Sequence, residues 1–194
     1  MRTLWTIGLA FILTSAFGQS NTEDTILLRD LYKRITPNNL TYIRESAGRE
    51  SMKKRLLDKS YRKFIDSTWE NLQLTDQEYE YLLDQIELNK DFVWKDSLLA
   101  NSQYIPKDSI WTYLHNERRK WYEIYKQNPA TENLKRERPW VFQFSRPIYL
   151  RDNQLCLLYY VALCGKVSGH YQIAFYKKEE DAWIEWIVIG GGDY

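Results

Sequence analysis

Histidine and cysteine are scarce in this sequence, with two of each among 194 residues. His115 and His170 lie far apart along the chain, so a transition-metal site would need carboxylates that no motif identifies. The formal net charge is +1, which is not the basic excess that electrostatic binding of duplex nucleic acid requires. No catalytic or cofactor motif rises above chance. We therefore predict no metal, no cofactor and no nucleic-acid partner.

The sequence also lacks an apolar run long enough to span a membrane. The run at residues 4–13 is shorter than the roughly 20 residues that a spanning helix needs. Arg2 precedes it, and the small residues Ala16 and Gly18 follow at a spacing that suits signal peptidase. This pattern predicts a signal peptide over residues 1–18, cleavage after Gly18 and a secreted or periplasmic protein; an uncleaved membrane anchor is the alternative. No cysteine follows the cleavage site to carry a lipoprotein anchor.

Apolar residues are plentiful, at 44% of the chain with 15% aromatic residues, which suffices for one packed domain over residues 19–194. Between residues 139 and 189 they crowd at strand spacing and predict strands at 140–150, 155–164, 170–177 and 182–189. Loops this short join only antiparallel neighbours, so we expect a four-stranded antiparallel meander. Both faces of the second strand are apolar, which predicts a strand covered on both sides. The glycines at 190–192 are predicted to lie in a flexible tail.

The part of the chain at about residues 21–128 is predicted to be helical. Apolar residues at helical spacing predict helices that begin near residues 21, 49, 76 and 106. The second is expected to reach residue 69, and the last to end before Asn128, because a residue preceding proline is driven out of the helical region. Thr75 and Glu78 form a capping-box sequence. Since Glu185 leaves one face of the last strand partly wet, we expect an α+β domain whose N-terminal helices pack on one face of the sheet.

The two cysteines fall on the same predicted strand. Eight residues at about 3.3 Å each place Cys156 roughly 26 Å from Cys164, whereas a disulfide needs Cα atoms within about 7 Å. We predict two separate buried thiols; an intermolecular bridge or a distorted loop near Cys164 is the alternative.

One predicted loop, at residues 164–170, brings together a nucleophile, a base, a cation and glycines. Cys164 or Ser168 could act as a nucleophile with His170 as the base, if the hairpin brings them within hydrogen-bond reach.

The same loop has non-catalytic interpretations. The backbone N–H groups of Gly165 and Gly169, together with Lys166, could bind a small anion. The glycines could also serve only to form a tight turn. Tyr171 and Trp183 are candidates for an aromatic binding face, although tryptophans in these elements more often fill the core.

A resemblance covers about fifty residues of the C-terminal part. It rests on Phe144-Ser145-Arg146-Pro147-Ile148-Tyr149, Leu158-Tyr159-Tyr160, Cys164-Gly165, Gly169, Tyr176-Lys177-Lys178 and Trp183. This pattern resembles that of a set of uncharacterised bacterial secreted proteins, which read "FS-x-PIF", "VYY", "CG…CG-x-G", "LYKK" and "W-x-I". The resemblance implies an envelope-associated module without known activity. The chain departs from it at residues 167–169, where Val-Ser-Gly replaces the second Cys-Gly and argues against a loop disulfide. The helix-then-sheet order also looks like NTF2-like or cystatin-like architectures, by analogy of fold alone.

These observations favour a secreted or periplasmic non-catalytic domain that binds a protein or glycan partner of the bacterial envelope. A small hydrolase that uses Cys164 or Ser168 with His170 is one alternative. The other is binding to the envelope surface through a basic amphipathic helix at residues 49–65.

Overall fold

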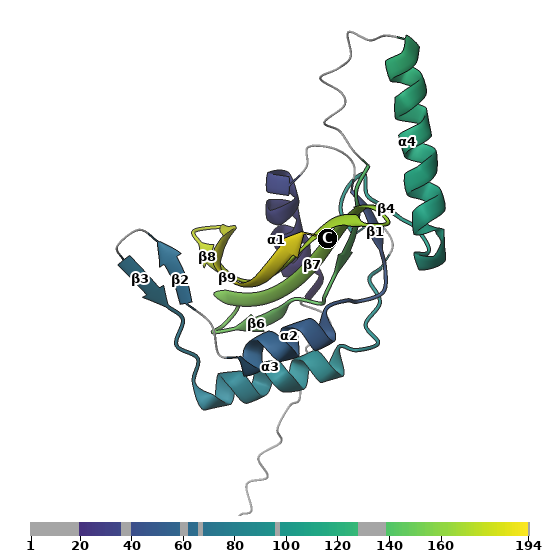
Figure 1. Ribbon diagram of the computed structural model, residues 1–194. Helices are drawn as coiled ribbons and strands as arrows, with labels where there is room; N and C mark the ends of the chain where they lie inside the picture. Colours follow the sequence, from purple (N-terminus) through teal and green to yellow (C-terminus); the bar gives the residue numbers. More distant parts are fainter. Residues whose placement is uncertain are drawn as a thin grey trace, which may run out of the picture.

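The computed structural model describes residues 20–35, 40–58, 62–65, 68–95, 98–127 and 139–193. In chain order the elements are α1 (Ser20–Ile35), β1 (Thr41–Ile43), α2 (Arg49–Leu57), β2 (Arg62–Ile65), β3 (Thr68–Asn71), α3 (Asp76–Leu88), β4 (Gln103–Tyr104), a 3-10 helix (Lys107–Ser109), α4 (Ile110–Gln127), β5 (Val141–Phe144), β6 (Ile148–Leu150), β7 (Leu155–Gly165), β8 (Ser168–Glu179) and β9 (Ala182–Asp193) (Figure 1). The predicted signal peptide lies outside the described residues.

Within the described residues, seven strands form one mixed sheet. Their order is β4-β1-β5-β7-β8-β9, and β6 pairs with β7 beside β5. The pairs β5–β7, β6–β7, β7–β8 and β8–β9 are antiparallel, whereas β1 is parallel to both β4 and β5. The predicted α+β class is confirmed, but the four-stranded antiparallel meander is wrong. Strands β1 and β4 have three and two residues, too few to produce a periodic pattern in the sequence.

The predicted strand at residues 140–150 is divided into β5 and β6 by a kink at Ser145, Arg146 and Pro147. Pro147 has no N–H to donate to a strand ladder, which explains the break. Ser145 still holds the kink against β7: its backbone N–H donates to the carbonyl oxygen of Tyr159 at 2.9 Å, and its Oγ accepts the N–H of Tyr159 at 3.0 Å. We call residues 145–147 the β5–β6 kink.

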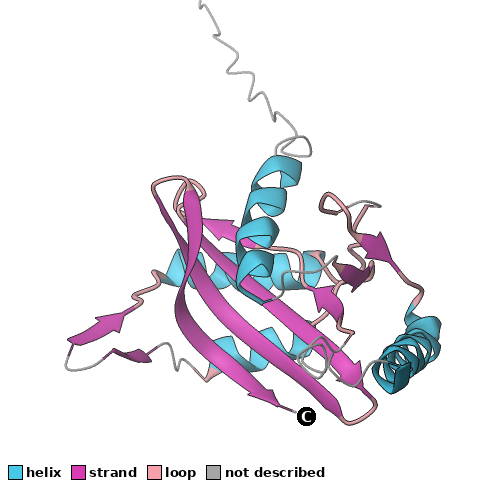
Figure 2. Ribbon diagram, turned by 90° about the horizontal axis from the view of Figure 1, so that it is seen from above, coloured by secondary structure: helices cyan, strands magenta, loops and turns pink. Residues whose placement is uncertain are grey.

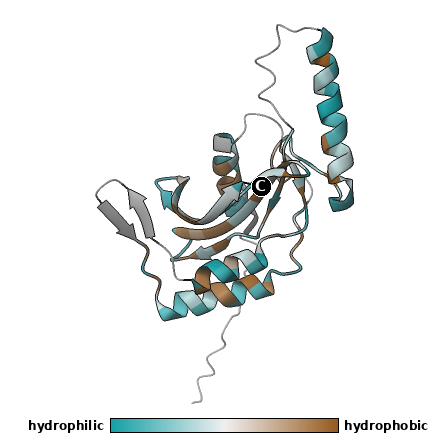
Figure 3. Ribbon diagram, in the orientation of Figure 1, coloured by the Kyte–Doolittle hydropathy of each residue, from teal (hydrophilic) through white to brown (hydrophobic). Residues whose placement is uncertain are grey.

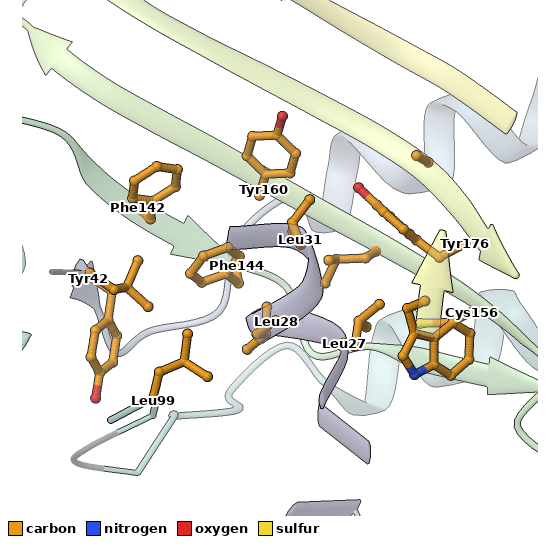
Figure 4. Close-up of a cluster of buried hydrophobic side chains, with 14 of the residues drawn as sticks. Leu27, Leu28, Leu31, Tyr42, Leu99, Phe142, Phe144, Cys156, Tyr160 and Tyr176 are labelled. Atoms are coloured by element: carbon orange, nitrogen blue, oxygen red, sulfur yellow. The ribbon is translucent and has the colours of Figure 1, made fainter. Parts of the chain in front are cut away.

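Helices cover both faces of the sheet (Figures 1 and 2). On one face, α1 packs Leu27, Leu28 and Leu31 against aromatic and aliphatic residues of the sheet (Figure 4). On the other face, α2 and α3 bury four side chains against β7, β8 and β9, namely Met52, Leu56, Leu82 and Ile86. The prediction that β7 is covered on both sides is confirmed. The prediction that the N-terminal helices pack on one face of the sheet is wrong. Figure 3 shows the central strands as mostly hydrophobic and α4, which extends beyond the sheet, as mostly hydrophilic.

The helix predicted over residues 49–69 is also wrong in its extent. Helix α2 ends at Leu57, and β2 and β3 form an antiparallel pair in which Phe64 is opposite Trp69. Over so short a segment, apolar spacing does not distinguish the end of a helix from a pair of short strands. The basic surface predicted for residues 49–65 is therefore not one continuous helix.

One further local prediction is confirmed. Helix α3 begins after Thr75 with both capping-box hydrogen bonds, from Glu78 N–H to Thr75 Oγ1 at 3.1 Å and from Thr75 N–H to Glu78 Oε2 at 2.9 Å. Helix α4 is described to Gln127, and the predicted stop at the following Asn-Pro lies outside the described residues. In contrast, the prediction of a flexible tail at the glycines is wrong, because β9 continues through them to Asp193 and pairs with β8. Strand pairing uses the backbone alone, so glycine does not prevent it.

Candidate functional site

Residues 164–170, where β7 turns into β8, contain the candidate nucleophile, base and cation; we call this segment the β7–β8 turn. In the fold, these residues make structural contacts. Cys164 is buried, and its thiol donates to the carbonyl oxygen of Ser168 at 3.5 Å. Arg118 of α4 donates from Nη2 to the carbonyl oxygen of Cys164 at 2.6 Å. A Cβ on Gly165 would lie 2.8 Å from that Nη2, so a side chain here would displace the end of the arginine. Lys166 is exposed at the tip of the turn.

His170 pairs with a different partner from the one that catalysis would need. Its Nδ1 lies 3.0 Å from Oδ1 of Asp193 on β9, and both side chains are exposed, at 39% and 89%. Its ring centroid is 5.9 Å from that of Tyr160. Within the described residues, no hydrogen bond joins His170 to Cys164 or Ser168. The hairpin therefore does not assemble the expected nucleophile and base.

The predicted aromatic binding face is divided between core and surface. Trp183 is 1% exposed, and it donates its backbone N–H to Asp30 at 3.1 Å and its indole N–H to Glu23 at 3.4 Å. Tyr171 is half-buried, with its ring centroid 6.3 Å from that of Tyr159. Gly169 is buried in β8. Trp183 therefore fixes α1 to the sheet and has no surface to offer a partner.

A small cavity that the sequence did not suggest lies between α2, the end of α3 and the β5–β6 kink. Its volume is about 100 Å³, and its lining includes the cationic side chains of Arg49, Lys90 and Arg146. No lining residue is acidic. The apolar part of the wall comes from Met52, Ile86 and Ile148. We call this feature the basic cavity.

Close packing at Gly48 shapes one wall of the basic cavity. Gly48 is the N-cap of α2 with φ 83°, a left-handed conformation that glycine adopts without strain. A Cβ there would lie 2.2 Å from Cγ of Tyr159, so any side chain would collide with that ring. Two hydrogen bonds hold the preceding loop, from Ser46 N–H to the carbonyl oxygen of Phe92 at 3.0 Å and from Ala47 N–H to that of Phe144 at 3.3 Å.

The cations around the basic cavity are held by neighbouring groups. Arg146 donates to Oδ1 of Asn89 at 3.2 Å and lies 5.1 Å from the centroid of the Phe92 ring. Arg49 pairs with Glu87, which also pairs with Lys53. These contacts orient two guanidinium groups at the wall without placing a carboxylate in the cavity.

The first turn of α2 adds positive potential at the same wall. Gly48 cannot cap this helix with a side chain, and the N–H groups of a first helical turn have no intrahelical acceptor. Gly48, Arg49 and Met52 all line the basic cavity. The partial positive charge of this helix end therefore adds to that of the side chains.

A buried carboxyl lies on the opposite face of the sheet, close to the β5–β6 kink. Asp24 of α1 is 4% exposed, and the hydroxyl of Tyr149 donates to its Oδ1 at 2.8 Å. Burial raises the pKa of Asp24 to about 6, while the hydrogen bond from Tyr149 and the charge of Arg146 act in the other direction. Burial also raises the pKa of Cys156 and of Tyr149. Asp24 therefore changes charge near neutral pH.

Sequence reasoning missed both the basic cavity and Asp24. The cavity residues come from three separate segments, near residues 46–52, 86–90 and 145–148. The one local signal was Pro147 inside a predicted strand, which marks a break where side chains can be redirected. Asp24 follows the predicted helix start near residue 21, where an acid is common, and its burial is not visible in the sequence.

Comparison with protein families, with curated proteins and with solved structures gives no match for this chain. In the described part of the chain, no helix is long and apolar enough to cross a membrane. The same residues contain no cluster of three or more potential metal ligands from histidine, cysteine, aspartate and glutamate.

Proposed function

We propose that the protein is a non-catalytic binding domain, secreted or periplasmic, which holds an anionic group of a protein or glycan partner in the basic cavity. The observation that carries this proposal is the lining of the cavity, with Arg49, Lys90 and Arg146 and without an acid. Three cations around one small concave site favour an anion there, because charge-assisted hydrogen bonds are the strongest that side chains make.

The size of the basic cavity supports a small group. A volume of about 100 Å³ exceeds the roughly 30 Å³ that one water molecule occupies in the liquid. A phosphate, sulfate or carboxylate group therefore fits, while the rest of its carrier stays outside. The apolar wall at Met52, Ile86 and Ile148 lowers the local dielectric constant and strengthens the attraction.

The contacts at the β7–β8 turn support a binding role over the hydrolase alternative. Cys164 and His170 each have other partners, and Cys164 is buried. A thiol nucleophile needs an adjacent base and access to substrate.

Isothermal titration calorimetry with sodium sulfate tests the proposal on the purified protein. We expect saturable binding at one site. Arg146→Gln should weaken it roughly 10-fold or more, since hydrogen bonds to charged groups contribute about 1.5–3 kcal/mol. Lys90→Gln should weaken it less, because the Lys90 side chain is 57% exposed and solvent screens its charge.

Lys166→Gln is the matched control. It removes one positive charge from the β7–β8 turn, and sulfate affinity should not change. If Lys166→Gln lost sulfate binding while Lys90→Gln and Arg146→Gln kept it, the anion site would lie at the β7–β8 turn and not in the basic cavity. Absence of sulfate, phosphate and acetate binding by the unaltered protein would refute the anion site.

A further inference from the structure

The basic cavity has an apolar floor and a charged opening. Met52, Ile86 and Ile148 line it and are 3%, 2% and 3% exposed. The side chains of Arg49 and Lys90 also line it, but they are 44% and 57% exposed. The apolar wall is therefore the deep part of the cavity, and these cations lie nearer to solvent.

A bare inorganic anion would use only part of this site. It would pair with the cations and leave the apolar floor in contact with water, whereas removal of apolar surface from water is favourable. The site therefore suits a ligand that carries a short apolar group directly beside its anion. The cavity volume of about 100 Å³ holds about three groups of roughly 30 Å³, the size of a water molecule, which is the number of carbons in a valine side chain.

Two uncharged polar residues, Ser46 and Asn89, also line the basic cavity. Asn89 accepts a hydrogen bond from Arg146 through Oδ1 at 3.2 Å, which leaves its Nδ2 as a donor. Within the described residues, neither Ser46 Oγ nor Asn89 Nδ2 has a hydrogen-bond partner. A peptide group supplies both an N–H for Ser46 Oγ to accept and a carbonyl oxygen to which Asn89 Nδ2 can donate.

We propose that the basic cavity binds the C-terminal carboxylate of a protein partner whose last residue has a short aliphatic side chain, such as valine. This inference rests on the proposed function and names the class of partner. The carboxylate lies among Arg49, Lys90 and Arg146, and the aliphatic side chain covers the floor. The last peptide group of the partner reaches Ser46 and Asn89. Capture of a terminal carboxylate is a recurring mode of peptide recognition.

The lining of the cavity favours a protein terminus over a glycan. No described residue of the lining is aromatic, so a sugar ring has no aromatic face there on which to stack. Sugar hydroxyls buried against Met52, Ile86 and Ile148 would also lose hydrogen bonds to water without replacement. An aliphatic side chain loses none.

Calorimetric titration with short peptides tests the proposal on the purified protein. The probe is an acetylated peptide of glycine and serine that ends in valine with a free carboxylate. Amidation of this terminus should weaken binding roughly 10-fold or more, because hydrogen bonds to charged groups are the stronger ones. A terminal glycine in place of valine should also weaken it roughly 10-fold, because the floor is then left uncovered. Excess sulfate should displace the free-acid peptide, since both use the same cations.

Two protein variants locate the bound terminus. Arg146→Gln should reduce the difference between the free-acid and amidated peptides to less than about 3-fold, because Arg146 is one partner of the carboxylate. Lys166→Gln, at the β7–β8 turn, is the control and should keep the full difference. If Arg146→Gln does not fold, the two peptides still decide the question on the unaltered protein.

The outcomes separate this inference from the anion site itself. Sulfate binding together with equal affinity for the free-acid and amidated peptides, or for the valine and glycine peptides, overturns the protein terminus and leaves the anion site intact. Isovalerate has the same carboxylate and isopropyl groups without a peptide group, and binding at least as tight as that of the peptide would assign the site to a free carboxylic acid. Tighter binding of a sulfated disaccharide would assign it to a glycan. Either result overturns the protein terminus. If neither sulfate nor the peptide binds, the anion site and this inference are both refuted.

Discussion

The hydroxyl of Tyr149 donates a hydrogen bond of 2.8 Å to the buried carboxyl of Asp24, and thereby joins α1 to β6. This contact places a titratable group in a buried part of the fold. Three further contacts join α1 to the sheet through acidic side chains, two from Trp183 and one from Lys178. The attachment of α1 therefore depends on carboxylate groups, of which Asp24 is the most buried.

Asp24 should make the stability of the protein depend on pH. Its folded-state pKa of about 6 lies above the ordinary value of 3.8. Protonated Asp24 therefore makes its full contribution to the free energy of unfolding below about pH 4, and this contribution is lost as the pH rises through 6. The loss amounts to about 3 kcal/mol. Urea denaturation should show Asp24→Asn gaining stability relative to the unaltered protein between about pH 4 and pH 7.5. Parallel profiles for the two proteins would contradict this account of Asp24.

Gly48→Ala should destabilise the fold strongly. The left-handed conformation, with φ 83°, costs an alanine roughly 1–2 kcal/mol, and the new Cβ would lie 2.2 Å from the Tyr159 ring. A combined loss above about 3 kcal/mol is expected from chemical denaturation. Gly191→Ala is the control, where the nearest atom is 3.3 Å away, and the loss should be smaller. Equal losses would mean that Tyr159 does not constrain Gly48.

Both thiols should be inert in the folded protein. Cys156 and Cys164 are free cysteines with 0% and 3% exposure, and burial raises the pKa of Cys156. Iodoacetamide should modify both only after unfolding, as followed by mass spectrometry. Rapid alkylation of Cys164 in the native protein, faster than that of a model thiol, would revive the hydrolase alternative.

Removal of the α3 cap should have a modest and local effect. Thr75→Ala deletes the oxygen that accepts the Glu78 N–H at 3.1 Å and should cost about 1 kcal/mol. Thr112→Ala, at an exposed position inside α4, is the matched control and should be neutral or slightly stabilising. The two variants can be compared by urea denaturation at one pH. An unaffected Thr75→Ala would show that the capping box contributes nothing to stability.

Sequence patterns identified the elements that have strong local signals. Strand β7 is apolar on both faces, and the Thr75–Glu78 cap marks the start of α3. They missed β1 and β4, because these strands pair in parallel between distant segments and are too short to show a period. Apolar spacing continues from α2 into β2 and β3, so it predicts helix where the fold has an antiparallel pair of strands.

The candidate site could not be derived from sequence for a different reason. The cations of the basic cavity are about forty and sixty residues apart along the chain, and tertiary packing alone makes them neighbours. The loop at residues 164–170 was a candidate site only because its reactive residues lie close together in the sequence. In the fold, His170 binds Asp193 instead of Cys164.

The most direct test of the anion site is a crystal structure of the protein with bound selenate, a tetrahedral dianion of sulfate-like geometry with a strong anomalous signal. The account predicts an anomalous peak in the basic cavity, within hydrogen-bond distance of Arg146 and close to Lys90 and Arg49. The same peak should be absent from Arg146→Gln crystals soaked in the same way. Selenate bound at the β7–β8 turn, with the basic cavity holding water alone, would contradict the central claim.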